Sequence, residues 1–179
     1  MPEAISLPEV DLRPHIRDIP DYPRPGILFR DITPLLADGP AFRQACLGLS
    51  RLFAQERVGA VASIESRGFT FGAVIAFQLG VGVVPVRKAG RLPAEVVSAE
   101  YELEYGKAVL EIHRDAVAPG TRVLVIDDLL ATGGTALATL ELIEALGGEA
   151  VGFGFVIELT ELRGKQRLAG HRVETLVSL

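Results

Sequence analysis

The sequence predicts an α/β fold in a single domain, with helices flanking a central, mostly parallel sheet. Two stretches indicate this, because in each a short apolar run is followed by a polar loop and then by apolar residues at helical spacing. The second stretch ends in another apolar run, which completes a β–α–β unit. A chain of 179 residues, 49% of them apolar, is long enough to bury a substantial core.

The first half of the chain contains the first strand–loop–helix stretch. Its predicted elements are, in order, a short helix near residues 12–19 within a polar, proline-rich start, an apolar run between two turns over residues 25–34, an amphipathic helix over 40–57, a strand over 58–64, a helix over 69–79 and a strand over 81–86.

The second half begins with alternating apolar residues, which predict a β-hairpin over residues 94–113. A strand buried on both faces follows at residues 123–126, because four apolar residues in a row are typical of the inside of a parallel sheet. A helix runs from Thr135 until two glycines stop it, and a strand covers residues 151–157. Beyond that point a short polar segment and a final strand are expected to serve packing or subunit contact only.

Composition excludes several functional classes. The net charge of −5 is not that of a nucleic-acid-binding protein. No apolar run reaches the ~18 residues of a membrane helix, and the acidic N-terminal residues do not match a signal peptide. With one cysteine, Cys46, no intrachain disulfide is possible, and we expect a cytoplasmic protein with neither a nucleic-acid nor a membrane partner. The three histidines lack ligand spacing, so no protein metal site is predicted.

The loop after the strand at residues 123–126 has the chemistry of a phosphate site. Two carboxylates, Asp127 and Asp128, precede a short loop that opens a helix and consists of Ala131, Thr132, Gly133, Gly134 and Thr135. Backbone N–H groups of such a loop, together with the helix N-terminus, bind phosphate, and the threonine hydroxyls add donors. The carboxylates can accept hydrogen bonds from sugar hydroxyls or from a magnesium-bound water. Phosphate beside a polyol indicates a ribose 5-phosphate.

Other phosphate loops do not fit this stretch. A Walker A loop needs a lysine that is missing here, and no Gly-x-Gly-x-x-Gly follows a predicted strand. A turn without function, with a solvated pair of aspartates at the strand end, is the alternative reading. A second anion loop is predicted at residues 65–68, because Ser66 and Arg67 lie between a strand and a helix in the same arrangement. Arg87 and Lys88 end the next strand on the same rim, close to Arg91.

These motifs resemble those of type I phosphoribosyltransferases over about residues 23–161. Residues 127–135 resemble their motif for phosphoribosyl diphosphate (PRPP), and the sequence of the motif is most similar to that of members that act on adenine. The resemblance implies the fold of that family, with a base-binding hood at about residues 1–36 and a flexible hairpin lid at about residues 94–113. It also implies that residues 65–68 grip diphosphate, in a loop where a strained first peptide bond is frequent. Family members often carry lysine where Arg91 stands, which leaves its contact open.

The resemblance also assigns further site residues. It puts Leu28, Phe29 and Arg30 at the purine, with Asp31 either orienting Arg30 or capping a turn. On the lid it identifies Tyr105 and the catalytic carboxylate Glu104, which acts either on the purine proton or on the cationic sugar. Glu102, two residues away on the same face of the strand, is the alternative to Glu104. Arg67 is the second catalytic candidate.

The implied reaction is a magnesium-dependent transfer of ribose 5-phosphate from PRPP to N9 of adenine, giving AMP and diphosphate in purine salvage. The Mg²⁺ is expected to arrive mainly with PRPP, and the implied assembly is a homodimer. Two alternatives stay open. One is a phosphoribosyltransferase for a 6-oxopurine, although no lysine donor for O6 lies near Leu28. The other is a PRPP-sensing regulator without catalysis, which would need a DNA-binding element.

Overall fold

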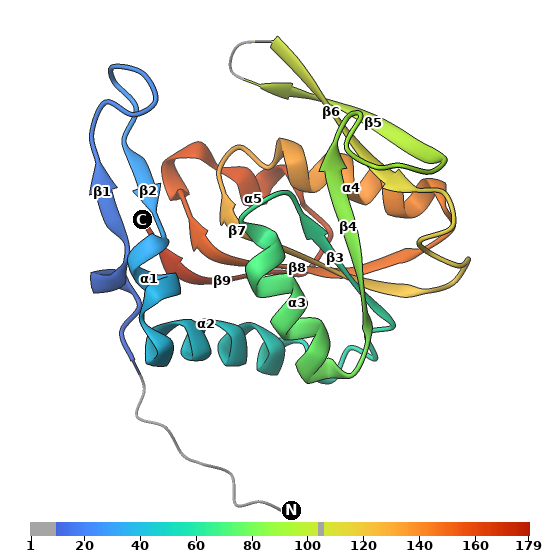
Figure 1. Ribbon diagram of the computed structural model, residues 1–179, viewed down its shortest axis with the longest axis horizontal. Helices are drawn as coiled ribbons and strands as arrows, with labels where there is room; N and C mark the ends of the chain where they lie inside the picture. The colour runs from blue at the N-terminus through green and yellow to red at the C-terminus, as the bar shows by residue number, and fades with distance from the viewer. Residues whose placement is uncertain (1–9, 104–105) are drawn as a thin grey trace, which may run out of the picture. The chain divides into compact units, whose positions relative to one another are not determined.

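The computed structural model describes residues 10–103 and 106–179. The chain forms two compact units, one ending at Leu47 and the other running from Gly48 to Leu179. Figure 1 follows both along the chain, from blue to red. Among the described residues, no helix has the length and apolarity needed to cross a membrane.

The N-terminal unit is built around a two-stranded antiparallel sheet. Its elements are the 3₁₀ turn η1 (Arg13–His15), β1 (Arg17–Ile19), β2 (Phe29–Asp31), α1 (Thr33–Ala37) and the first part of α2 (Gly39–Leu52). The predicted helix at residues 12–19 is wrong, because only the 3₁₀ turn forms there and residues 17–19 pair with β2 instead. The strand pairing places Arg17 opposite Asp31 and Asp18 opposite Arg30, so opposite charges face each other across the ladder.

Helix α2 ends five residues earlier than its apolar spacing predicts. After Leu52 the chain continues in turns, in which Ala54 N–H bonds to Arg51 and Glu56 N–H bonds to Phe53. Arg57 then adopts a φ of 49°, which no helical residue has. Phe53 is still fully buried, so the apolar spacing extends past the end of the helix into the turn.

The larger unit contains a seven-stranded sheet in the order β5-β6-β4-β3-β7-β8-β9. Strands β3, β4, β7, β8 and β9 are parallel, and the hairpin β5–β6 joins antiparallel to β4. This confirms the prediction of a mostly parallel sheet. The strands are β3 (Ala60–Ile64), β4 (Gly82–Lys88), β5 (Val96–Leu103), β6 (Gly106–His113), β7 (Arg122–Leu130), β8 (Glu149–Glu158) and β9 (Val173–Ser178).

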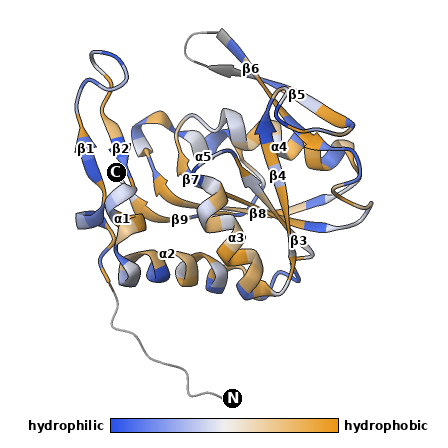
Figure 2. Ribbon diagram, viewed as in Figure 1, coloured by the Kyte–Doolittle hydropathy of each residue, from blue (hydrophilic) through white to orange (hydrophobic). Residues whose placement is uncertain are grey.

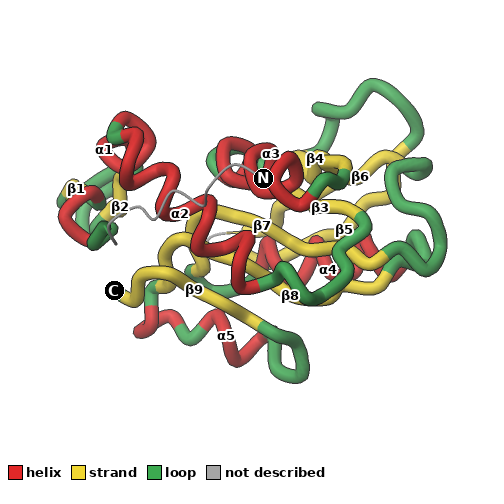
Figure 3. Tube along the Cα trace, turned by 90° about the horizontal axis from the view of Figure 1, so that it is seen from below, coloured by secondary structure: helices red, strands yellow, loops and turns green. Residues whose placement is uncertain are grey.

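Helices cover both faces of this sheet. α4 (Gly134–Ala145) packs on one face, in a core cluster with Val123 and Val125 of β7. α3 (Gly68–Leu79) lies on the other face, where its Gly72 approaches Ser63 so closely that a Cβ on Gly72 would lie 2.2 Å from the Ser63 hydroxyl oxygen. Figure 3 shows the two helices on either side of the strands. A short 3₁₀ turn, η2 (Thr160–Leu162), and α5 (Gly164–Arg167) follow β8.

The predicted hairpin forms. Val97 pairs with Ile112, and Ala99 pairs with Leu110, so apolar residues of the two strands lie opposite each other. The predicted end of β7 is wrong, however. The strand continues to Leu130, still paired with β8, and Asp127 and Asp128 therefore lie inside the strand rather than after it. Because β3, β4 and β7 are parallel neighbours, the loops after them open on the same edge of the sheet.

Candidate active site

The two aspartates of β7 are buried side by side. Asp127 is 8% exposed and Asp128 is 4% exposed, and the N–H of Asp128 donates to Oδ1 of Asp127 at 2.9 Å. Burial raises the pKa of both carboxyl groups, and for Asp127 the neighbouring charge of Asp128 raises it further. Nε of Arg67 lies 2.7 Å from Oδ2 of Asp128. The charge of Arg67 opposes this increase in the pKa of Asp127 and Asp128, but both pKa values stay raised. One guanidinium thus compensates a buried acidic pair.

The loop at residues 65–68 connects β3 to α3 and reaches this pair. The Glu65-Ser66 peptide bond is cis, which agrees with the expectation of an unusual bond at this place. Gly68 lies against β7, because a Cβ there would be 2.9 Å from Oδ1 of Asp127 and 3.0 Å from the Ile126 carbonyl oxygen. Only glycine permits such an approach, so Gly68 brings Arg67 to the acidic pair. Ser66 is exposed at the top of the loop.

Glu65 connects this loop to the end of β4. Its Oε2 accepts hydrogen bonds from Nε of Arg87 at 3.2 Å and from the N–H of Lys88 at 3.0 Å. Burial raises the pKa of Glu65, but these hydrogen bonds and the charge of Arg87 outweigh it and lower the pKa overall. Arg87 also donates to the carbonyl oxygen of Arg91 at 2.9 Å. The predicted basic rim is therefore brought together, with Arg87 held from two sides and the side chains of Lys88 and Arg91 exposed.

The loop at residues 131–135 leads from β7 into the twelve-residue helix α4. Gly133 is its N-cap with a φ of +83°, a conformation that favours glycine. Thr132 and Thr135 remain partly exposed, so their hydroxyls are accessible to a ligand. A loop of this form at the start of a helix of three turns is suited to binding an anion.

The lid candidates Glu104 and Tyr105 lie outside the described residues. Tyr101, on the described part of β5, is half-buried against the core of the sheet. Its pKa is raised by burial and, to a smaller extent, by the charge of Asp127.

The base-binding candidates belong to the N-terminal unit. Leu28 is 45% exposed, Phe29 is half-buried with its ring edge-on to Tyr22, and Nη1 of Arg30 is 2.5 Å from Oδ1 of Asp18. The suggestion that Asp31 orients Arg30 is wrong, since Asp18 takes that place.

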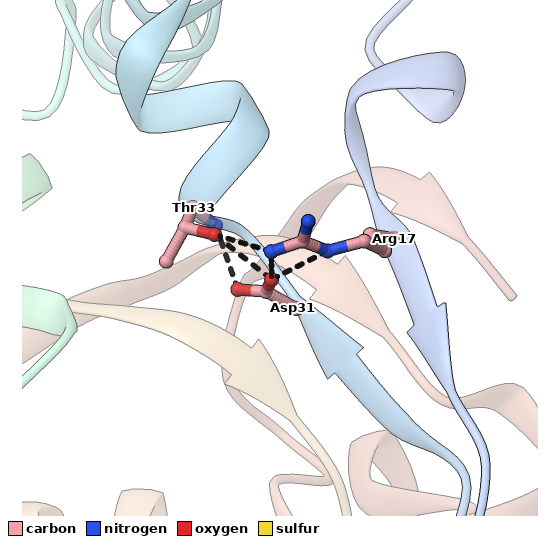
Figure 4. Close-up of polar contacts among 3 residues, drawn as sticks. All are labelled: Arg17, Asp31 and Thr33. Atoms are coloured by element: carbon pink, nitrogen blue, oxygen red, sulfur yellow. Dashed lines mark hydrogen bonds and ion pairs between the residues drawn. The ribbon is translucent and has the colours of Figure 1, made fainter.

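Asp31 instead organises the start of α1, as Figure 4 shows. Its Oδ2 accepts two hydrogen bonds from Arg17, at 2.5 and 3.0 Å, and one from the hydroxyl of Thr33 at 2.8 Å. Its Oδ1 accepts from the N–H of Thr33 at 2.9 Å. The N–H of Thr33 and the guanidinium of Arg17 lower the pKa of Asp31 despite its burial. Arg17 and Asp18 were missed by sequence reasoning, although the complementary pairs Arg17-Asp18 and Arg30-Asp31 were a signal for antiparallel pairing.

Known proteins share the part of the chain that forms these loops. The model of the phosphoribosyl transferase domain family matches residues 36–172. These residues include both anion loops, the acidic pair and the basic rim. The chain therefore belongs to the phosphoribosyl transferase family.

Individual relatives narrow the assignment. The chain is 57% identical to adenine phosphoribosyltransferase of Methylococcus capsulatus over 93% of its own length and 97% of that protein. It matches the structure of adenine phosphoribosyltransferase from Thermoanaerobacter pseudethanolicus with a TM-score of 0.91 at 49% identity, covering 94% of this chain and 98% of the other. The Saccharomyces cerevisiae enzyme, solved with an imino-altritol bisphosphate and adenine, matches with a TM-score of 0.86 at 39% identity over 93% of this chain and 96% of the other. These similarities put the chain among the adenine phosphoribosyltransferases.

The buried carboxylate of Asp31 yields a prediction on stability. Asp31→Asn should lower the free energy of unfolding by about 1–3 kcal/mol at about pH 7, because the charge facing Arg17 is lost in a buried place. The folded pKa of Asp31 is below the unfolded one. The Asp31 carboxylate therefore contributes fully to the free energy of unfolding above its pKa in the unfolded state, about 4. This contribution is lost as the pH falls through the pKa of Asp31 in the folded state.

Urea unfolding followed by circular dichroism, repeated at decreasing pH, measures this difference. The gap between wild type and Asp31→Asn should narrow below about pH 4. Asp18→Asn is the matched control, since the Asp18 side chain is 54% exposed and its ion pair should contribute less than about 1 kcal/mol. Equal losses in both variants, or a gap that does not change with pH, would contradict the assignment.

Proposed function

We propose that the protein transfers the 5-phosphoribosyl group of PRPP to N9 of adenine, giving AMP and diphosphate in purine salvage. The observation that carries the proposal is the contact of the loop at residues 65–68 with the acidic pair, where Arg67 Nε lies 2.7 Å from Asp128 Oδ2. The loop at residues 65–68, which carries Arg67, therefore lies on the same edge of the sheet as the two aspartates and the loop at residues 131–135. The carboxylates of Asp127 and Asp128 can accept hydrogen bonds from hydroxyl groups of a ligand. These three parts correspond to the diphosphate, the ribose hydroxyls and the 5-phosphate of PRPP. The similarity to adenine phosphoribosyltransferases supports adenine as the base.

The sugar and its phosphate take two of these parts. Backbone N–H groups of residues 131–135 and the hydroxyls of Thr132 and Thr135 donate to the 5-phosphate. Asp127 and Asp128 accept from the ribose hydroxyls, which return hydrogen-bond partners to two buried carboxylates. Binding of this kind orients C1 of the sugar without contributing to bond cleavage.

The leaving diphosphate takes the third part. Negative charge grows on it as the C1–O bond breaks, so cations fixed beside it stabilise the transition state more than the ground state. Arg67 and Lys88, with the hydroxyl of Ser66, are the donors we assign to this charge, and Arg91 adds a further cation. Arg67 is paired with Asp128, so its guanidinium is held at the acidic pair, in the position that we assign to the diphosphate. Arg87, held by Glu65, stiffens the rim as well as adding charge.

The base and the lid complete the proposal. Phe29 stacks on the purine, Leu28 lines its edge and contributes backbone groups, and Arg30 donates to a ring nitrogen. Glu104 acts on the purine proton or on the cationic sugar, and Tyr105 belongs to the lid that excludes water from that sugar.

Mg²⁺ carried by PRPP is part of the proposal. Magnesium at phosphate sites is usually bound by one or two carboxylates together with substrate oxygens and waters. The adjacent carboxylates of Asp127 and Asp128, partly compensated by a single arginine, fit that kind of site. When bound, the metal supplies positive charge to the diphosphate, and Arg67 and Lys88 provide the protein's share.

A homodimer in the cytoplasm is the assembly we propose. Phe77 on α3 is 86% exposed and Val83 on β4 is 40% exposed. Figure 2 shows α3 as hydrophobic mainly toward its C-terminal end. The buried residues of this helix are Gly68, Phe71, Gly72, Ile75 and Ala76, so Phe77 lies outside its buried set. Large exposed apolar side chains at neighbouring elements favour contact with a second protein surface. A second copy of the chain is the partner we assign to this surface.

Diphosphate release tests the activity and the base together. PRPP and Mg²⁺ are supplied with adenine, hypoxanthine, guanine or xanthine in separate reactions. We expect release with adenine alone. Release with a 6-oxopurine would change the base, and tight PRPP binding without any release would support a regulator instead.

The role of the acidic pair is tested by the double variant Asp127→Asn with Asp128→Asn. PRPP turnover should fall by at least about 100-fold, because the amides cannot supply two charged acceptors to the ribose hydroxyls. The melting temperature should not fall, since the variant removes two adjacent buried charges. Asp115→Asn with Glu144→Gln, which changes two exposed carboxylates of the same unit, is the control and should keep full activity. Full turnover in the first double variant would remove the pair from the mechanism.

The dimer is tested by Phe77→Glu. Sedimentation equilibrium should give a dimer for the wild type and a monomer for the variant, because a buried carboxylate at the interface lacks a partner. Leu162→Glu, at a residue that is 39% exposed elsewhere in the unit, is the matched control and should remain dimeric. A monomeric wild type, or a dimeric Phe77→Glu, would contradict the proposed interface.

A further inference from the structure

The segment that follows β8 lies directly against the loop at residues 131–135. A Cβ on Gly164 would lie 2.3 Å from the carbonyl oxygen of Ala131 and 2.9 Å from Cδ1 of Leu130. In the opposite direction, a Cβ on Gly133 would lie 2.8 Å from the carbonyl oxygen of Gly164. The two backbones are therefore in contact, and neither glycine has room for a side chain. We call residues 159–168 the backing segment.

An ion pair holds the backing segment in place. Glu158, the last residue of β8, is only 6% exposed. Its Oε2 lies 2.6 Å from Nζ of Lys165 and accepts a hydrogen bond from the hydroxyl of Thr175 at 3.2 Å. A buried carboxylate needs such compensation. Lys165 directly follows Gly164, so the ion pair fixes the position of the glycine that touches the loop.

Backbone hydrogen bonds fasten the same segment at its start. The N–H of Leu159 donates to the carbonyl oxygen of Leu130, one residue before the loop, at 2.9 Å. The N–H of Thr160 donates to the carbonyl oxygen of Leu179 at 2.9 Å. At its other end Leu168 is 1% exposed and belongs to the core of the sheet. The backing segment is thus anchored to β7, to the chain after β9 and to the core.

The loop depends on a support of this kind. Its N–H groups bind a phosphate only if they converge within a few tenths of an ångström, which requires neighbours that lock the backbone. Gly133 has a φ of +83°, and as a glycine it lacks the Cβ that restricts the backbone of other residues. The contact with Gly164 limits that freedom from the side of the protein.

We propose that Gly164 and the ion pair of Glu158 with Lys165 are positioning residues for the 5-phosphate of PRPP, an inference that rests on the proposed function. Gly164 touches the loop, and the ion pair acts through Gly164, the neighbour of Lys165 in the chain. Their effect is confined to ligands that carry a 5-phosphate, because the diphosphate loop at residues 65–68 belongs to other elements, β3 and α3.

Gly164→Ala tests the contact. The added Cβ displaces the carbonyl oxygen of Ala131. Affinity for AMP and for ribose 5-phosphate should fall by roughly 10- to 100-fold, whereas affinity for diphosphate should not change, as measured by isothermal titration calorimetry. The KM for PRPP should rise more than kcat falls. Gly82→Ala is the matched control, since a Cβ there meets no atom within 4 Å and φ is not positive.

Lys165→Met tests the ion pair and keeps the inference falsifiable if Gly164→Ala does not fold. AMP affinity should fall in this variant, diphosphate affinity should stay the same, and Lys165→Arg should restore AMP binding. Arg114→Met is the control, because Arg114 and Glu95 form an exposed ion pair at 3.6 Å in the same unit.

Three outcomes would overturn a proposal, and they differ. Wild-type protein that binds no AMP would overturn the proposed function itself. Wild type that binds AMP, with Gly164→Ala and Lys165→Met binding it equally well, would overturn only the positioning role. Equal losses of AMP and diphosphate affinity in these variants would also overturn it, since a general loss of structure affects both loops.

Discussion

The burial of two adjacent carboxylates in β7 is the constraint on which the rest of the site depends. Asp127 and Asp128 lie within β7, where the strand is still paired with β8 although its pairing with β3 ends at Ile126. Both residues are buried, so water cannot solvate them freely. Their proximity to each other raises the cost of charging both. Arg67 offsets part of that cost, and it can do so only because the loop after β3 opens on the same edge as the end of β7. A ligand that brings hydroxyl donors to the carboxylates and an anion to the arginine satisfies both sides of this arrangement.

Close backbone contacts at glycines set the geometry around that pair. Gly68 lets the first turn of α3 touch Asp127, and Gly133 and Gly164 let the phosphate loop touch the segment after β8. At each of these places a Cβ would lie within 3 Å of a neighbouring atom. The two anion loops are therefore held by steric fit, while the charged side chains adjust within the space that remains. Within this frame Arg67 pairs with Asp128 and Arg87 pairs with Glu65, so the site holds its cations on its own carboxylates.

In the N-terminal unit, cross-strand charge pairs compensate a buried carboxylate and orient a nearby arginine. Asp31 is satisfied by Arg17 and by the start of α1, which leaves Asp18 to hold Arg30. The arginine that we assign to the base is thus oriented by a surface carboxylate of the opposite strand. A hydrogen-bonded turn between the strands, in which Asp21 accepts from the N–H of Gly26, presents Leu28 as an exposed residue.

The sequence by itself determined the order and type of nearly all elements in the larger unit, because periodicity of apolar residues is a local property. It also predicted the positions of the two loops at residues 65–68 and 131–135 and the existence of the hairpin, since glycines, hydroxyls and alternating apolar residues lie close together in the chain. Tertiary structure alone decided which distant residues meet. The pairing of Arg67 with Asp128 and the contact of Gly164 with the loop at residues 131–135 depend on strand neighbours and packing, which no local pattern encodes. For the same reason the strand at residues 17–19 was mistaken for a helix, and the segment after β8 was credited with no part in the site.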